Sequence, residues 1–272
     1  MMRTVAVRGA SLEVAEWGAG EPVVFVQTTL TADELRPVAT DAALEGHRRI
    51  LYHRRGYAGS SPATPDPASI ARDAADCGAL LEALDVGRAH VVGLSFSGAI
   101  AMQLAADRPE LVHSLTLIEP PPTHIPSVDE FRAVNDELLA LRRAQGIEAA
   151  FEEFMQILVG PDWEEASEER LPGSVEQMRE DAGTFFDVDL AGLFGWEFGE
   201  EDADRIACPV LYVGGTDSGA WWVEVRELML EWFPHADDAV IDGADHWLAL
   251  THAPQIAAVL ADFLRRHPMD QD

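Results

Sequence analysis

The sequence predicts an α/β protein with a mostly parallel, doubly wound sheet and one inserted helical segment. Up to residue 119, short apolar runs typical of buried strands alternate with segments of helical periodicity. A proline triplet at 120–122 then opens a long acidic stretch that has no convincing strand pattern. The strand pattern returns at Pro209, so we expect the acidic stretch to interrupt one continuous core.

The individual elements follow from local patterns. The first residues alternate and turn at Gly9-Ala10, which favours an antiparallel hairpin. The later strands are short apolar runs, and the helices place apolar residues at intervals of three and four. The expected strands are 4–8, 12–17, 23–26, 49–52, 91–92, 115–118, 209–213 and 239–241, and the expected core helices are 31–44, 69–84, 97–106, 222–233 and 254–266.

Length and breaks give the domain organisation. A chain of 272 residues is long for a single domain but typical of an α/β core with an insertion. We expect a core formed by residues 1–120 and 206–272, with a helical insertion at 121–205. Between Pro121 and Ile206 there are 22 acidic and 6 basic residues, so the surface of the insertion must be strongly solvated.

Charge and composition limit the classes of binding partner and the cellular location that we expect. The net charge of −29 disfavours nucleic acid and anionic membranes and favours neutral or cationic small molecules. The first residues are too polar for a signal peptide, and no apolar run reaches the length of a membrane span. Two cysteines, Cys77 and Cys208, make neither a disulfide framework nor a metal site. We therefore expect a cytoplasmic protein without cofactor or metal, and its oligomeric state, monomer or homodimer, stays open.

One candidate nucleophile lies where a strand runs into a helix. The segment Gly93-Leu94-Ser95-Phe96-Ser97 resembles the G-x-S-x-G elbow, in which a serine projects from a strained turn between closely packed elements. Ser97 stands in place of the second glycine, but it is small, and Gly98 follows it. A serine at a helix N-terminus is also a common cap, so the motif needs partners to indicate catalysis.

Two downstream residues supply those partners in the chain order serine, acid, histidine. Asp217 follows one predicted strand and His246 follows the next. Catalytic groups gather at the carboxyl ends of parallel strands, so we expect these side chains to meet Ser95. Glu119, at the end of the strand before the insertion, is the second choice for the acid. A metal cluster of Asp242, Asp245 and His246 explains the same residues less simply.

Together these pieces resemble the α/β-hydrolase superfamily, over nearly all of the chain except the insertion. The motifs are the first core strand, the loop from His53 to Ser60, the elbow, Gly-x-x-Asp at 214–217 and Gly-Ala-Asp-His at 243–246. The resemblance implies Ser95 as nucleophile, His246 as base, Asp217 as its carboxylate partner, and the 121–205 insertion as a cap over the site.

One departure concerns the oxyanion hole. The family usually has His-Gly after its first core strand, whereas this chain has Gln27-Thr28-Thr29. The resemblance implies the Thr29 and Phe96 N–H groups as donors, with Thr28 as an alternative and the Gln27 amide or a threonine hydroxyl as substitutes. Arg54 in the next loop, with Arg55 beside it, could bind an anion, but pairing with nearby carboxylates is the simpler expectation.

Aromatic residues indicate the substrate. Those after the acid loop, after the histidine and within the insertion are expected to wall an apolar pocket. The expected pocket residues are Gln27, Trp221, Trp222, Trp247, Phe185 and Trp196.

The sequence thus predicts a serine hydrolase that cleaves a small, apolar ester, lactone or thioester through an acyl-enzyme on Ser95. Two alternatives stay open. One is a ligand-binding or regulatory protein of the same fold with little turnover, which the Gln27-Thr28 departure motivates. The other is a cofactor-free oxygenase or isomerase that uses His246 as a base.

Overall fold

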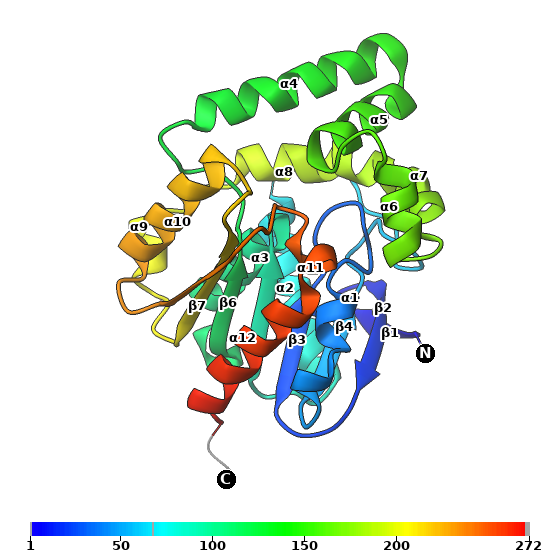
Figure 1. Cartoon of the computed structure of the whole chain (residues 1–272). Coiled ribbons are helices and arrows are strands. Elements are labelled where there is room, and N and C mark those ends of the chain that lie inside the picture. The colour runs from blue at the N-terminus through cyan, green and yellow to red at the C-terminus, as the bar shows by residue number, and fades with distance from the viewer. Residues whose placement is uncertain (1, 67, 270–272) are drawn as a thin grey trace.

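The computed structural model describes residues 2–66 and 68–269 and has one eight-stranded sheet at its centre (Figure 1). The strand order is β1-β2-β4-β3-β5-β6-β7-β8, in which β1 and β2 are antiparallel to their neighbours and all other pairs are parallel. The strands are β1 (Arg3–Val7), β2 (Ala10–Trp17), β3 (Pro22–Val26), β4 (Arg48–Tyr52), β5 (Ala89–Leu94), β6 (Val112–Ile118), β7 (Val210–Gly215) and β8 (Asp237–Ile241). The predicted mixed, mostly parallel sheet is confirmed.

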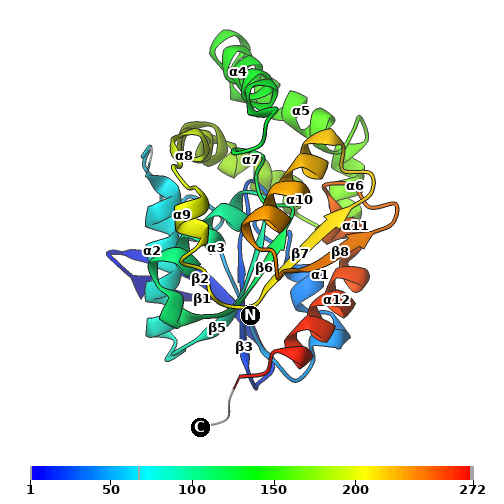
Figure 2. The same cartoon turned by 90° about the vertical axis from the view of Figure 1, so that its left-hand side faces the viewer.

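Helices cover both faces of the sheet (Figure 2). One face carries α2 (Ser69–Ala83), α3 (Phe96–Asp107) and α10 (Ala220–Trp232), and the other carries α1 (Arg36–Ala39), α11 (Leu248–Thr251) and α12 (Ala253–Arg266). Successive residues of a strand point to opposite faces, so Val24 and Val26 join the core on the first side while Val23 and Phe25 join the core on the second. This two-sided burial explains the uninterrupted apolar runs in the sequence.

The segment 121–205 contributes helices and no strand among its residues, all of which are described. These are α4 (Val128–Gln145), α5 (Ile147–Leu158), α6 (Trp163–Arg170), α7 (Ser174–Thr184), the π-helical turn η3 (Phe185–Asp189), α8 (Leu190–Gly195) and α9 (Glu200–Ala203). The elements α4 to α8 lie above the end of the sheet at which β5 leads into α3 (Figure 1). The short 3-10 helices η1 (Ala42–Leu44) and η2 (Pro109–Leu111) complete the fold.

The helix expected over 31–44 is shorter than predicted. Pro37 occupies the first turn of α1, so the helix begins at Arg36, and it ends at Ala39, with Thr40 as its C-cap. Asp41 then caps η1, its side chain accepting a hydrogen bond from Ala43 N at 2.8 Å. Residues 27–35 therefore form a loop at the carboxyl end of the sheet. Within the described ranges 2–66 and 68–269, no helix has the length and apolarity needed to cross a membrane.

Candidate active site

Ser95 occupies a strained turn between β5 and α3. Its backbone has φ 49° and ψ −123°, a conformation that a residue with a Cβ rarely adopts. Two hydrogen bonds hold it: Ser95 N donates to Ile118 O at 2.9 Å, and Gly98 N donates to Ser95 O at 2.8 Å. The turn leaves the Ser95 side chain at the carboxyl end of the sheet, beside the N-terminus of α3.

The residues around the turn explain its departure from the usual motif. A Cβ at Gly93 would lie 2.4 Å from Ser97 O, and one at Gly98 would lie 2.8 Å from the Cβ of Pro120, so both positions require glycine. Ser97 does not require it, because its hydroxyl is fully buried, accepts from Leu94 N and donates to Leu94 O, both at 2.9 Å. The serine at this position therefore ties the turn together.

His246 lies within reach of the Ser95 hydroxyl. Its Nε2 is 3.1 Å from Ser95 Oγ, and the loop that carries it follows β8. The indole of Trp222 stacks on the imidazole, with ring centroids 3.9 Å apart and planes 24° from parallel. This stacking restricts rotation of the imidazole ring and keeps its Nε2 directed toward Ser95.

The carboxylate beside His246 belongs to Glu119, which corrects the expectation of Asp217. Glu119 Oε2 is 2.6 Å from His246 Nδ1, and Oε1 accepts a hydrogen bond from Gly215 N at 2.8 Å. The side chain is fully buried, and its backbone has φ 42°. A carboxylate on Nδ1 selects the tautomer whose Nε2 accepts a proton from serine.

Asp217 lies further out, in the loop beyond β7. At the end of β7, a Cβ on Gly215 would lie 2.1 Å from Ala244 O in the histidine loop, so no side chain fits there. Asp217, two residues later, is exposed, and its carboxylate accepts from Thr216 Oγ1 at 3.0 Å. Its backbone N–H binds Ala244 O at 2.8 Å, so this residue joins the two loops without reaching the imidazole.

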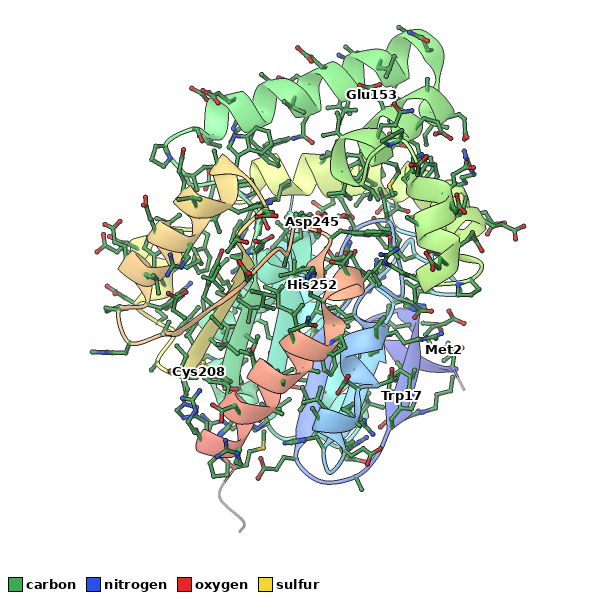
Figure 3. All side chains as sticks on the ribbon, viewed as in Figure 1. Met2, Trp17, Glu153, Cys208, Asp245 and His252 are labelled. Atoms are coloured by element: carbon green, nitrogen blue, oxygen red, sulfur yellow. The ribbon has the colours of Figure 1, made fainter. Side chains whose placement is uncertain are left out.

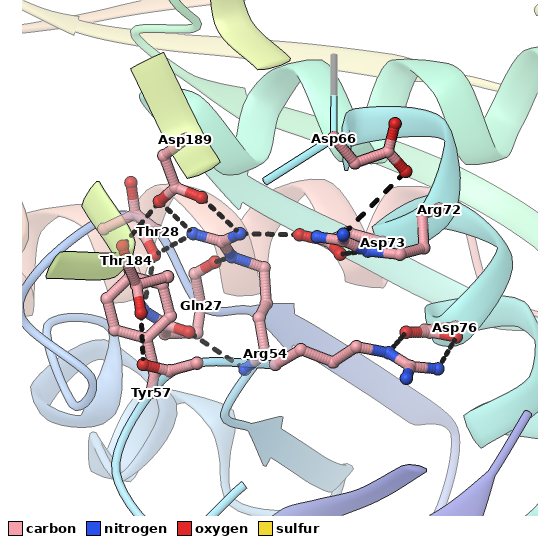
Figure 4. A network of polar contacts seen from close by, with 12 residues as sticks. Gln27, Thr28, Arg54, Tyr57, Asp66, Arg72, Asp73, Asp76, Thr184 and Asp189 are labelled. Atoms are coloured by element: carbon pink, nitrogen blue, oxygen red, sulfur yellow. Dashed lines mark hydrogen bonds and ion pairs between the residues drawn. The ribbon is translucent and has the colours of Figure 1, made fainter. Parts of the chain in front are cut away.

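The loop after β3 is held by a buried arginine (Figure 4). Arg54 Nε donates to Gln27 O and Nη2 donates to Thr28 O, both at 2.9 Å. Since C=O and N–H of a trans peptide point in opposite directions, the Thr29 N–H points away from Arg54. Thr28 and Thr29 both line the cavity beside Ser95.

Arg54 is the centre of a wider buried network. It pairs with Asp73 of α2 through Nη1 at 2.6 Å, and with Asp189 of η3 through Nη1 at 3.2 Å and Nη2 at 2.7 Å. Its guanidinium also lies over the Phe96 ring, 4.6 Å from the centroid. Burial disfavours its charge, but Asp189 and Asp73 more than compensate and raise the pKa of Arg54. The charge of Arg54 is therefore neutralised by carboxylates of this chain, and Arg54 does not form a site for an external anion.

Arg55 likewise pairs with a carboxylate rather than presenting a free cation. Its Nε lies 2.5 Å and its Nη2 3.0 Å from the two oxygens of Asp76 on α2. The expected pairing of both arginines with nearby carboxylates is thus what the structure contains.

A cavity of about 330 Å³ lies between the sheet and the segment above it. Ser95, Phe96 and His246 are in its wall, together with mostly apolar residues of α4, α5, η3 and α8. Of the residues expected to wall it, Trp221, Trp222 and Phe185 do so. Glu34, from the loop before α1, also lines the cavity. Sequence reasoning missed this residue because it assigned residues 31–44 to a helix, whereas Glu34 lies in a loop.

Three residues expected in the cavity wall lie elsewhere. Gln27 is buried and braces the loop, its Oε1 accepting from Arg54 N at 2.9 Å. Trp196 donates from its indole to Gln103 on α3 at 2.8 Å, and Trp247 lies beneath the guanidinium of Arg170, 5.1 Å from the ring centroid. The apolar surfaces of Trp196 and Trp247 stabilise the contact between the core and the inserted segment.

The alternative of a metal cluster at Asp242, Asp245 and His246 has no support in the geometry. Among residues 2–66 and 68–269, no group of three histidine, cysteine or acidic side chains is placed to hold an ion. Asp245 accepts from Trp247 N at 3.0 Å at the loop end labelled in Figure 3, which is the role of a turn aspartate.

Comparisons with known proteins agree with the fold. The family model described as "alpha/beta hydrolase fold" matches residues 22–253. A protein of Caulobacter sp. (strain K31) named "Putative carbamate hydrolase RutD" is 26% identical over 236 residues, covering 82% of each chain. A thermophilic esterase from Thermogutta terrifontis superposes with a TM-score of 0.81 at 19% identity, covering 98% of this chain and 100% of that one. The enol-lactonase from Burkholderia xenovorans LB400 gives 0.76 at 21% identity, covering 97% and 100%.

Proposed function

Because the chain belongs to the alpha/beta hydrolase family, we propose that it is a serine hydrolase that cleaves a small, mostly apolar ester, lactone or thioester. One observation carries the proposal: Ser95 Oγ, the two nitrogens of His246 and Glu119 Oε2 form a continuous chain of contacts of 3.1 and 2.6 Å. That chain ends at a cavity large enough for a small acyl compound.

The reaction proceeds in two halves. His246 Nε2 takes the proton of Ser95 Oγ as the oxygen attacks the substrate carbonyl, and the buried Glu119 carboxylate stabilises the imidazolium. His246 returns the proton to the leaving alcohol or thiol as the carbonyl re-forms, which leaves an acyl group on Ser95. Water, deprotonated by His246, then attacks the acyl group, and His246 returns the proton to Ser95 Oγ as the acid leaves.

The tetrahedral oxyanion needs two preorganised donors. Phe96 N opens α3, where the first N–H groups have no helical partner, and the helix dipole adds positive potential. Thr29 N is the second donor, since Arg54 holds the Thr28 carbonyl on the opposite side of the peptide. The Thr28 hydroxyl, buried and without a partner in the described chain, is a further donor from the same loop.

The segment 121–205 acts as a cap over a core of residues 1–120 and 206–272. Its helix α7 holds the loop after β3, because the Gln177 amide accepts from Ala32 N at 3.0 Å and donates to Leu30 O at 2.8 Å. The cap thereby covers the cavity and supplies much of its apolar wall. The esterase and lactonase among the similar structures, and the name of the Caulobacter relative, are consistent with attack on an acyl carbonyl.

A fluorophosphonate probe tests the proposal. We expect one adduct, located on Ser95 by mass spectrometry, with loss of labelling in Ser95→Ala and strong reduction in His246→Ala, while an ester panel shows turnover. Folded protein that is not labelled on Ser95 would refute the acyl-enzyme. Tight binding of panel members without turnover would favour a regulatory protein, and a native reaction that survives Ser95→Ala would favour His246 acting alone as a base.

A further inference from the structure

The charged side chains in the cavity wall all carry carboxylates, apart from His246. The lining, all of it in the described part of the chain, holds four acidic residues and no arginine, and the sequence has no lysine. The acidic residues are Glu34, Asp189, Asp217 and Asp245. Such a wall repels an anionic substrate and attracts a cationic one.

Three of the four carboxylates are already engaged. Asp189 is neutralised by Arg54 and accepts a hydrogen bond from Tyr57 Oη at 2.5 Å. Asp217 and Asp245 are exposed and accept local hydrogen bonds within their own turns. They therefore contribute long-range potential but are not free to pair with a buried ligand group.

Glu34 differs from the other three. It is 9% exposed, and no described residue donates a hydrogen bond to its carboxyl group or pairs with it. Its neighbour Asp33, by contrast, lies 3.1 Å from His53 Nε2 and 3.0 Å from Arg36. Burial alone raises the pKa of Glu34 to about 8. The carboxyl oxygens are not fully buried, so they are reached from the cavity, and a ligand donor there would supply the partner that the protein does not.

The aromatic residues of the cavity wall are also suited to a cationic ligand group. Aromatic faces attract cations as well as apolar chains, and five aromatic side chains other than Phe96 line the cavity. They are Phe131, Phe154, Phe185, Trp221 and Trp222. A basic amine on a short apolar substrate would find its counterion in Glu34 and its remaining surface covered by rings.

We infer that Glu34 is a recognition site for an amine, and that the preferred substrates are esters or related acyl compounds carrying a protonated amine. This inference rests on the proposed hydrolase function. On binding, Glu34 releases its proton to solvent and the ammonium group takes its place beside the carboxylate, so the occupied site is as neutral as the empty, protonated one.

The kinetic test compares two esters of the same shape. In 3-(dimethylamino)propyl butanoate the protonated nitrogen replaces one CH group of 4-methylpentyl butanoate, and a second pair carries the same groups on the acyl side. We expect kcat/KM to favour the amine at least about tenfold in one pair, roughly what one partly desolvated ion pair supplies. Glu34→Gln should abolish the preference, so that the ratio of the two kcat/KM values falls to about one. The exposed Glu137→Gln serves as the charge-matched control and should keep it.

A binding measurement separates this inference from the proposed function. Hexyldimethylammonium is titrated by calorimetry into Ser95→Ala, with and without Glu34→Gln, in buffers of different ionisation enthalpy. We expect binding with proton release that the second substitution removes. Equal affinity in both proteins, or no amine preference in an active wild type, would overturn the inference while leaving the hydrolase intact. Amine binding without ester turnover would support the site and count against the hydrolase.

Discussion

Asp189 and Arg54 form a bidentate ion pair between the inserted segment and the loop after β4, with distances of 3.2 and 2.7 Å. Both side chains are 1% exposed. The same guanidinium donates to Gln27 O and Thr28 O, so the segment above the cavity and the orientation of the Thr29 N–H depend on one side chain. The folding of the inserted segment and the geometry of the proposed oxyanion hole are thus coupled.

Asp189→Asn should lower kcat about tenfold or more with little change in KM, because a displaced Thr29 N–H acts on the transition state and not on substrate binding. Asp76→Asn is the matched control. It weakens the ion pair with Arg55, in which Asp76 is also buried, but this pair does not contact the loop after β3. Urea unfolding should show losses of about 1–3 kcal/mol for both. Equal kinetic losses in the two variants would show that Asp189 acts only through stability.

Glu119→Gln tests the carboxylate that the structure places on His246. The amide keeps the volume but cannot stabilise the imidazolium, so kcat should fall about 10³–10⁴-fold. Asp217→Asn, whose carboxylate bonds only within its own turn, should stay within about threefold of wild type. The measurement is steady-state hydrolysis of the best ester in the panel. The reverse ranking would restore Asp217 as the acid.

The fold was predictable because its signals are local. Buried parallel strands such as Val23 to Val26 are continuous apolar runs, and the glycines beside Ser95 mark close backbone contacts that the structure contains. The acid of the site was harder to identify, since both Glu119 and Asp217 follow strands. The choice depends on which carboxylate reaches His246 Nδ1, and a sequence does not contain the 2.6 Å distance found at Glu119.

The cavity wall was the least predictable part. Trp196 and Trp247 have the same composition signal as Trp221 and Trp222, yet they face the joint between core and insertion. Which side of a helix or loop faces a cavity depends on the packing of distant elements, and a pattern of three or four residues does not determine it.

Ser97→Ala tests whether the serine in the elbow is structural. The substitution removes both hydrogen bonds to Leu94 and leaves a buried backbone group unsatisfied, so the free energy of unfolding should fall by about 1–3 kcal/mol. Fluorophosphonate labelling of Ser95 should slow only a few-fold, because the turn is also held by Ile118 and Gly98. Ser97→Gly should lose similar stability, and a gain in stability would show that the usual glycine is preferred here.

Glu34 should make stability depend on pH in a direction opposite to that of a paired carboxylate. Its folded pKa, raised to about 8 from a reference of 4.5, means that the folded state holds a proton that the unfolded state has released. The free energy of unfolding therefore falls as pH rises from 4.5 to 8, by on the order of a few kcal/mol. Urea unfolding of wild type and Glu34→Gln at pH 5 and pH 9 measures the effect, with Glu137→Gln as control. The Glu34→Gln protein should gain stability relative to wild type at the higher pH, whereas the control should follow wild type. Parallel curves for all three proteins would mean that the Glu34 carboxyl is solvated in the folded state.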